Sequence, residues 1–252
     1  MRNLNNLLLA SVCALSLLAG CGRKGDPGPS GQNLTGNIVG FVSAFDEAGN
    51  VLPKAGVSVT VDGVTPAITA TSDASGHYEL PTVRNGTYNL SYTRADLSTY
   101  RQLSVAHVGG DQPTYLGAAT LTQASSTRAS NLTAVASPAT GSAFLQFNLT
   151  NSVLGAGANK RYVIYIGSSA SVTSATGLLY DNTTYYASAN TLAETLTRAK
   201  LNALGFATGT PVYAIIYGLA WNYSTYTDPA TGRIMFSGLS ATPSNAAAFI
   251  VP

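Results

Sequence analysis

The sequence predicts an all-β protein with two tandem β-sandwich domains behind an N-terminal signal and a flexible stalk. Short stretches in which apolar and polar residues alternate recur along most of the chain, and turn-forming residues separate them. Only 10% of the residues are charged, whereas Gly numbers 25 and Tyr 14, as is typical of exported β-proteins with many turns. An aperiodic stretch near the middle divides the strands into two series. Each series is long enough to bury a core of its own.

Residues 1–20 are expected to be a signal peptide. Arg2 supplies a positive start, and residues 7–18 carry no charge. A helix of about 14 residues spans only ~21 Å, which is short of the ~30 Å hydrocarbon core of a bilayer. The run is therefore a targeting signal and not a membrane span. It ends in the motif Leu18-Ala19-Gly20-Cys21.

This motif resembles the lipobox of bacterial lipoproteins. The resemblance implies a diacylglyceryl thioether on Cys21, cleavage before it and acylation of the new amine. Several acyl chains, at ~0.8 kcal/mol per buried methylene, anchor a protein far more firmly than one chain. The alternative is an ordinary signal peptide with a chance cysteine. Gly22 stands where an Asp would signal inner-membrane retention, which favours the outer membrane and leaves the periplasmic or surface face open.

A stalk is expected at 21–35 and a first domain at 36–122. The stalk is rich in Gly and Pro and has no apolar periodicity, as in extended linkers. The Asn85-Gly86 pair predicts a hairpin turn, because both central residues of such a turn prefer a positive φ. The strands expected in this domain lie near residues 38–45, 57–61, 77–80, 87–92, 100–105 and 115–121, in a total of about seven.

The first domain resembles the carboxypeptidase regulatory-like domain. The matching pieces are Gly40-x-Val42, Asp46-x-x-Gly49, Gly56-Val57-x-Val59, Asp73-x-x-Gly76-x-Tyr78-x-Leu80 and Gly86-Thr87-Tyr88-x-Leu90. The resemblance implies a transthyretin-like sandwich of seven strands without an active site. Two departures, Lys54-Ala55 and residues 96–99, fall in loops and affect only the loop shapes expected there.

A linker is expected at 123–130, followed by a second domain at 131–252. The linker is rich in Ser, Ala and Thr and has no periodicity. One short helix is predicted in the second domain, with Asn190 or Thr191 as its cap and Gly205 as its stop. The apolar residues that recur at helical spacing are Leu192, Leu196, Ala199 and Ala203. The strands expected around it lie at 131–137, 143–149, 161–166, 212–221 and 234–239, the last two joined by a loop at 228–232.

The second domain resembles a fibronectin type III-like or immunoglobulin-like sandwich. The cues are the strand starts Asn131-Leu132-Thr133 and Phe144-Leu145-Gln146-Phe147, and Pro211-Val212-Tyr213 as a tyrosine corner. Two features depart from that pattern. The core Trp that is expected early is replaced by a late Trp221, and the helix stands where a short turn is usual.

Residues of the types that usually carry catalysis or bind metals are sparse, so we predict that the protein is not an enzyme and has no cofactor and no metal site. The two histidines, His77 and His107, are thirty residues apart, and Cys21 is the only cysteine after the signal. Calcium at the Asp46 and Asp73 loops is an alternative, although turn formation already explains those residues. No Gly-x-Ser-x-Gly motif occurs, and Gly155–Lys160 lacks the ending of a phosphate loop. A formal net charge of +2 is too balanced for a nucleic-acid partner.

Aromatic residues in predicted loops of the second domain remain as ligand-contact candidates. Such side chains offer a large contact area at low entropic cost, but they can also fill the core. The candidates are Trp221, Tyr223, Tyr226, Tyr185 and Tyr186. We therefore expect a lipid-anchored envelope protein that acts as a binding or display module toward a glycan or another envelope protein. The alternatives are a glycan-binding accessory of polysaccharide uptake or adhesion, and a purely structural spacer.

Overall fold

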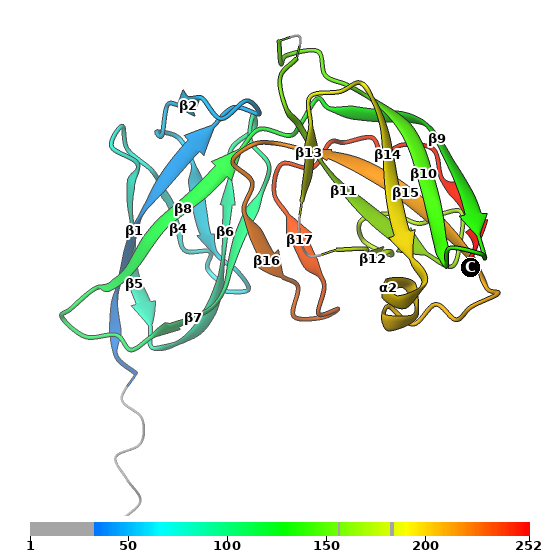
Figure 1. Ribbon diagram of the computed structural model, residues 1–252. Helices are drawn as coiled ribbons and strands as arrows, with labels where there is room; N and C mark the ends of the chain where they lie inside the picture. Colours follow the sequence, from blue (N-terminus) through cyan, green and yellow to red (C-terminus); the bar gives the residue numbers. More distant parts are fainter. Residues whose placement is uncertain (1–32, 156, 182–183) are drawn as a thin grey trace, which may run out of the picture. The chain divides into compact units, whose positions relative to one another are not determined.

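The computed structural model describes residues 33–155, 157–181 and 184–252, and its regular secondary structure is almost entirely β-strand. The strands form two β-sandwiches within one compact unit, Leu34–Pro252 (Figure 1). The predicted all-β fold class is thereby confirmed. The expected signal, the lipidation site Cys21 and nearly all of the stalk lie outside the described residues. No helix in the described ranges is both long enough and apolar enough to cross a bilayer.

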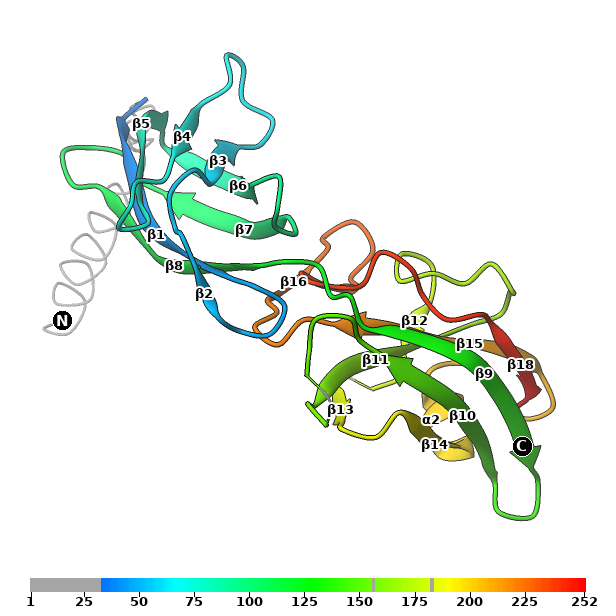
Figure 2. The ribbon, with the colours of Figure 1, turned by 90° about the horizontal axis from the view of Figure 1, so that it is seen from above.

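The first sandwich is made of two antiparallel-dominated sheets, seen as separate layers in Figure 2. In one sheet, β1 (Thr35–Phe45) lies between β5 (His77–Arg84) and the parallel strand β8 (Thr114–Thr122), and its end pairs with β2 (Val51–Leu52). The other sheet has the order β4 (Thr69–Thr71), β3 (Ser58–Val61), β6 (Gly86–Thr93) and β7 (Tyr100–His107). Every second residue of β1 is buried, so one of its faces forms the core and the other stays accessible.

Two buried tyrosines connect the sheets of the first sandwich. The hydroxyl oxygens of Tyr78 and Tyr92 lie 2.8 Å apart, and the Tyr92 hydroxyl also donates to Gln102 Oε1 at 3.0 Å. Burial raises the pKa of both phenols, so both stay protonated at neutral pH. Both hydroxyls are thus hydrogen-bonded in the core, as buried polar groups usually are.

The turn predicted after β1 forms as expected. Asp46 Oδ1 accepts hydrogen bonds from the backbone N–H groups of Ala48 at 2.9 Å and Asn50 at 2.8 Å. Burial raises the pKa of Asp46, but hydrogen bonds from Asn50, Ala48 and Gly49 outweigh it and leave this pKa below its usual value. Gly49 has a φ of 94°, a conformation that glycine adopts without strain. The aspartate oxygens thus serve the turn itself.

The hairpin predicted at Asn85-Gly86 is wrong. β5 pairs with β1 in one sheet, whereas β6, which starts at Gly86, pairs with β3 and β7 in the other. The chain therefore crosses between the sheets at this point, and Gly86 does not have a positive φ. The three atoms nearest to a Cβ added at Gly86 all belong to the Tyr88 side chain, at 3.1–3.2 Å. Asn-Gly favours a tight turn locally, but the strands on either side of it pair in different sheets, so no hairpin forms.

The second sandwich packs a three-stranded sheet on a larger one. The smaller sheet has the order β9 (Arg128–Ser137), β10 (Ser142–Thr150) and β14 (Thr191–Thr197). The larger one joins β11 (Lys160–Gly167), β15 (Pro211–Leu219) and β18 (Ala247–Ile250), with β12 (Leu178–Leu179) and β13 (Tyr185–Ala187) pairing along β11. The main core lies between the sheets and includes Leu145, Ile164 and Ile216.

A second apolar layer covers the outer face of the larger sheet. Tyr165, Ile215 and Leu219 are buried there, under Phe236 and Leu239 of the following chain. Part of this cover is the hairpin of β16 (Thr225–Thr227) and β17 (Ile234–Phe236), joined by the loop predicted at 228–232. Because β11 is buried on both faces, its sequence is an almost continuous apolar run.

Tyr213 does not form the predicted tyrosine corner. Tyr213 is half-buried against the outer apolar layer. Its hydroxyl has no hydrogen bond to any described residue.

The helix predicted from Leu192 is also corrected, because Thr191–Thr197 is the strand β14 and the helix α2 covers only Arg198–Ala203. A spacing of four residues between Leu192 and Leu196 fits a helix, but it equally fits a strand, in which every second residue faces the same side. Thr191, Thr195 and Thr197 alternate with the inward residues and favour the strand. Thr197 Oγ1 then caps the helix by accepting from the Lys200 N–H at 3.3 Å.

The segment between the sandwiches is hydrogen-bonded on both sides. The Gln123 N–H donates to Phe45 O at 3.0 Å, and the Ser125 N–H donates to Gly238 O at 3.1 Å. Thr127 is fully buried, and β9 already begins at Arg128. The domain boundaries expected at 122 and 131 stay a prediction, but hydrogen bonds to both sandwiches hold the residues between them in place.

Candidate functional site

Three of the five candidate aromatics surround the side chain of Arg161, which lies on β11. The Arg161 guanidinium carbon lies 4.2 Å from the ring centroid of Trp221, 5.7 Å from that of Tyr223 and 5.9 Å from that of Tyr186. Contacts of this kind attract the cation to the negative faces of the rings. We call these four residues the Arg161 cluster.

The pairing of β11 and β13 explains which tyrosine joins the cluster. Arg161 is in register with Tyr186, so the two side chains lie on the same face of the sheet. Tyr185 therefore points to the opposite face, where its ring stacks on that of Tyr162 at 5.4 Å and 15°. Burial, with Asp181 and Glu194 nearby, raises the pKa of Tyr185 above its usual value.

Tyr226 is also outside the cluster and packs on the first sandwich. Its ring centroid lies 6.5 Å from that of Tyr100, and β16, which carries it, lies beside β7 (Figure 1). Tyr223 is half-buried and tilts against Phe236 at 5.5 Å. Only Trp221, 40% exposed, and Tyr186, 63% exposed, present substantial ring surface to solvent.

Trp221 connects the two sandwiches as well as facing Arg161. Its backbone N–H donates to Glu47 O at 2.9 Å, and a Cβ added at Gly49 would come within 3.0 Å of Trp221 Cδ1. The next residue, Asn222, donates from Nδ2 to Gly49 O at 3.5 Å. The indole ring is therefore held between the Gly49 turn of the first sandwich and the Arg161 guanidinium of the second.

A cavity of about 240 Å³ lies beside this ring. Its wall combines the polar side chains of Glu47, Ser125 and Arg161 with the apolar ones of Leu154, Leu219 and Trp221. Such a combination of apolar surface with a few fixed polar groups is typical of ligand sites.

The two charged groups of the cavity are not paired with each other. The buried Glu47 carboxylate accepts through Oε2 from the Ser126 N–H at 2.5 Å, from Ser125 Oγ at 3.3 Å and from Asn151 Nδ2 at 3.2 Å. Arg161 donates from Nη1 to Thr184 Oγ1 at 3.0 Å, while its buried Nε has no partner among the described residues. In the described part of the chain, no carboxylate lies within 4.0 Å of the guanidinium. Among the described residues, the Arg161 guanidinium is therefore held by aromatic rings and by Thr184, without an ion pair.

The two histidines, for which the sequence predicts no metal site, do not line this cavity. His107 is buried in the first sandwich, where Nδ1 lies 2.7 Å from Thr114 Oγ1 and Nε2 lies 3.0 Å from Val83 O. His77 lies on the outer face of β5, beside Phe41. Over the described ranges, no group of three His, Cys, Asp or Glu side chains could hold a metal ion.

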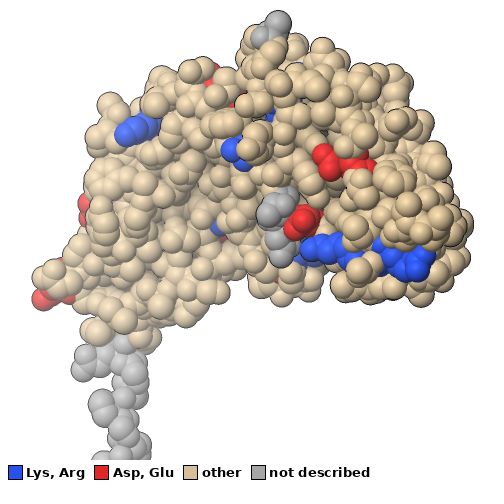
Figure 3. Space-filling view, in the orientation of Figure 1, with Lys and Arg blue, Asp and Glu red and all other residues tan. Residues whose placement is uncertain are grey.

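The sequence pattern assigned Arg161 no functional role, and it marked Glu47 only as a residue of the Asp46 turn that could supply an oxygen to calcium. Arg161 opens an apolar strand, where one basic residue is expected at the strand end. The contacts of both residues come from partners about 25 to 100 residues away along the chain. Charged side chains are sparse on the face of the molecule shown in Figure 3, so a cation set among aromatic rings is a distinctive feature.

No protein-family model matches the chain, and no curated protein is similar to it in sequence. Among solved structures, a Bacteroides uniformis protein assigned provisionally to carbohydrate binding is 13% identical, with 85% of this chain and 98% of that one covered and a TM-score of 0.34. A DUF3823 family protein from Parabacteroides merdae is also 13% identical, with 82% and 98% covered and a TM-score of 0.27.

A type II cohesin–X-dockerin complex from Acetivibrio cellulolyticus contains a chain that is 20% identical, with a TM-score of 0.30. The match covers 36% of this chain and 59% of that one, so this chain spans less than two thirds of its length. With identities and scores this low, the function has to follow from the chain's own residues.

Proposed function

We propose that this protein is a lipid-anchored, non-catalytic binding module of the bacterial cell envelope, and that its Arg161 cluster contacts the ligand. The observation that carries the proposal is the pair of exposed rings, Trp221 and Tyr186, beside a 240 Å³ cavity and around a guanidinium that has no carboxylate partner among the described residues. An aromatic face supports an apolar ligand surface, and a guanidinium binds a carboxylate through two parallel hydrogen bonds.

The same contacts favour a glycan that carries carboxylate groups over a role as a plain spacer. A spacer would need these rings only as packing material, which is the use that Tyr185 and Tyr226 serve. Tyr186 packs little and is mostly exposed, so packing does not account for it. The resemblance of the two sandwiches to carboxypeptidase regulatory-like and fibronectin type III-like domains, both non-catalytic modules, supports the same proposal.

The Tyr186→Ala variant is expected to weaken binding of uronic-acid-containing oligosaccharides at least fivefold, because an aromatic contact contributes about 1 kcal/mol. Binding is measured on a glycan array and by titration calorimetry. Val135→Ala, which removes an exposed apolar side chain from β9, is the matched control and should bind as the wild type does. Equal affinities for wild type and Tyr186→Ala would show that the Arg161 cluster is not part of the binding surface.

The membrane anchor is tested separately. Cys21→Ala is expected to move the protein from the membrane fraction to the soluble fraction and to abolish incorporation of labelled fatty acid, because the thioether cannot form. Cys13→Ala is the matched control, since this cysteine lies within the predicted signal and should leave lipidation unchanged. Wild-type protein without lipid by mass spectrometry would contradict the proposal.

A further inference from the structure

A row of three rings crosses the outer face of the first sandwich. Phe41 on β1 lies between His77 on β5, at a centroid distance of 5.3 Å, and Tyr115 on β8, at 6.4 Å. Phe41 and His77 are in register across the strands, and Tyr115 is 66% exposed. Phe41 alternates with the buried residues of β1, and His77 and Tyr115 contact it from the neighbouring strands, so the row belongs to the face of the sheet turned away from the core.

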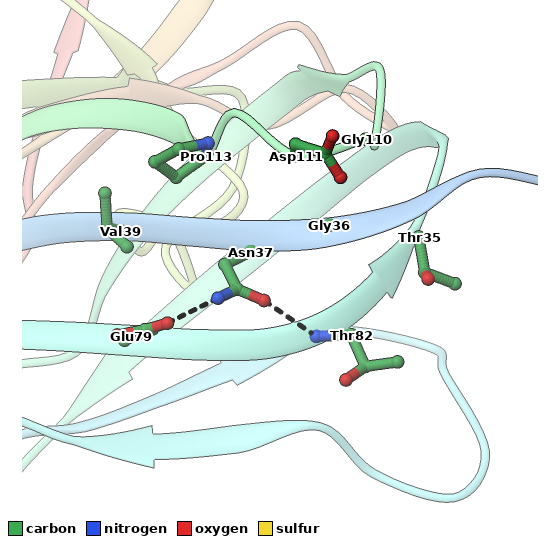
Figure 4. A pocket seen from close by; sticks show the side chains of 9 residues that line it. All are labelled: Thr35, Gly36, Asn37, Val39, Glu79, Thr82, Gly110, Asp111 and Pro113. Carbon is green, nitrogen blue, oxygen red and sulfur yellow. Dashed lines mark hydrogen bonds between the residues drawn. The ribbon is translucent and has the colours of Figure 1, made fainter.

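A polar pocket of about 370 Å³ adjoins this row (Figure 4). Asn37 comes from β1, Glu79 and Thr82 come from β5, and Asp111 comes from the loop between β7 and β8. Asn37 is held in one orientation, because its Nδ2 donates to Glu79 Oε1 at 2.5 Å and its Oδ1 accepts from the Thr82 N–H at 3.2 Å. The amide and the two exposed carboxylates thus line the pocket.

Val39 makes the pocket and the aromatic row one continuous surface. It lines the pocket, and it is in register with Glu79 on one side and with Tyr115 on the other. Glu79 and His77 stand two residues apart on β5, so they share the same face of that strand. A ligand lying along β1 can contact rings at one end and carboxylates at the other.

The chemistry of this surface selects a ligand rich in hydroxyl groups. Ionised Glu79 and Asp111 only accept hydrogen bonds, so they suit a ligand with several O–H donors and repel an anionic one. The exposed ring of Tyr115 suits the C–H face of a sugar ring, which is apolar and nearly flat. Neutral saccharides combine both properties.

We propose that the outer face of β5, β1 and β8 is a binding site for neutral oligosaccharides, with Tyr115 as the stacking platform and Glu79 and Asp111 as acceptors of sugar hydroxyls. The site is separate from the Arg161 cluster, which lies on the second sandwich and at the junction. Neither site needs the other in order to bind.

In the test, the full-length protein is titrated with cellohexaose, xylohexaose, mannohexaose and maltohexaose, and binding is measured by titration calorimetry. At least one hexasaccharide should bind. Tyr115→Ala should weaken that binding at least fivefold, and Glu79→Gln combined with Asp111→Asn should weaken it about tenfold. Both variants change exposed side chains, so their melting temperatures should match that of the wild type.

Val135→Ala is the matched control, because it removes an equally exposed apolar side chain from the other sandwich and should leave hexasaccharide binding unchanged. Failure of all four hexasaccharides to bind, or equal binding by wild type and Tyr115→Ala, would overturn the proposal. A calcium titration gives the third arm, and Ca²⁺ binding that is lost in Glu79→Gln/Asp111→Asn without any saccharide binding would make this a cation site instead. None of these outcomes depends on whether the Arg161 cluster binds acidic glycans.

Discussion

Gly218→Val is expected to destabilise the protein by about 3 kcal/mol or more, because the chain that enters the second sandwich crosses directly over this residue. A Cβ at Gly218 would lie 2.2 Å from Thr127 O and 2.6 Å from Thr127 Cβ. The neighbouring atoms are mostly backbone and cannot rotate away. Gly218 itself is held by Ser240, since its N–H donates to Ser240 Oγ at 3.1 Å and its carbonyl accepts from the Ser240 N–H at 2.9 Å.

The measurement for Gly218→Val is the free energy of unfolding from denaturant titration of purified protein. The matched control is Gly117→Val on β8, where an added Cβ meets nothing within 4 Å and φ is not positive. The control should unfold within about 0.5 kcal/mol of the wild type. If both variants lost the same stability, the crossing of Thr127 over β15 would not be the reason.

Glu47→Ala is expected to destabilise the protein by about 3 kcal/mol, because three donors lose a charged acceptor in a buried place. Hydrogen bonds to charged groups contribute about 1.5–3 kcal/mol each, and buried donors left without a partner are costly. The donors are the Ser126 N–H, Ser125 Oγ and Asn151 Nδ2. They belong to the connecting segment and to the second sandwich, so the carboxylate joins the Gly49 turn to both.

Differential scanning calorimetry should show a melting temperature lower by roughly 5–10 °C for Glu47→Ala. Glu79→Ala is the control, because this glutamate lies on the same sandwich but is exposed. Its melting temperature should stay within about 2 °C of the wild type. An unchanged melt for Glu47→Ala would show that water replaces the carboxylate at no cost and that the junction does not depend on it.

The predicted aromatic site illustrates how far a linear sequence can lead. The concentration of aromatics in the second half drew attention to Trp221, Tyr223 and Tyr186, which meet around Arg161, and their role as ligand contacts stays a prediction. It did not separate Tyr186 from Tyr185, because adjacent residues of a strand point to opposite faces and only the pairing with β11 decides which face is which. The first sandwich carries a second aromatic row, His77–Phe41–Tyr115, in which Phe41 lies 36 residues from His77 and 74 residues from Tyr115 along the chain.

By itself, the sequence determined the all-β class, the alternation of the main strands and the turn at Asp46, because these depend on neighbouring residues. Tertiary structure decided the crossing at Asn85-Gly86 and the change of Thr191–Thr197 from helix to strand, because sheet partners far along the chain override local preference. It also decided which charged groups meet aromatic rings. Arg161 and Glu47 acquire their environment only when two sandwiches pack around Trp221, and no local pattern records a contact between segments so distant in sequence.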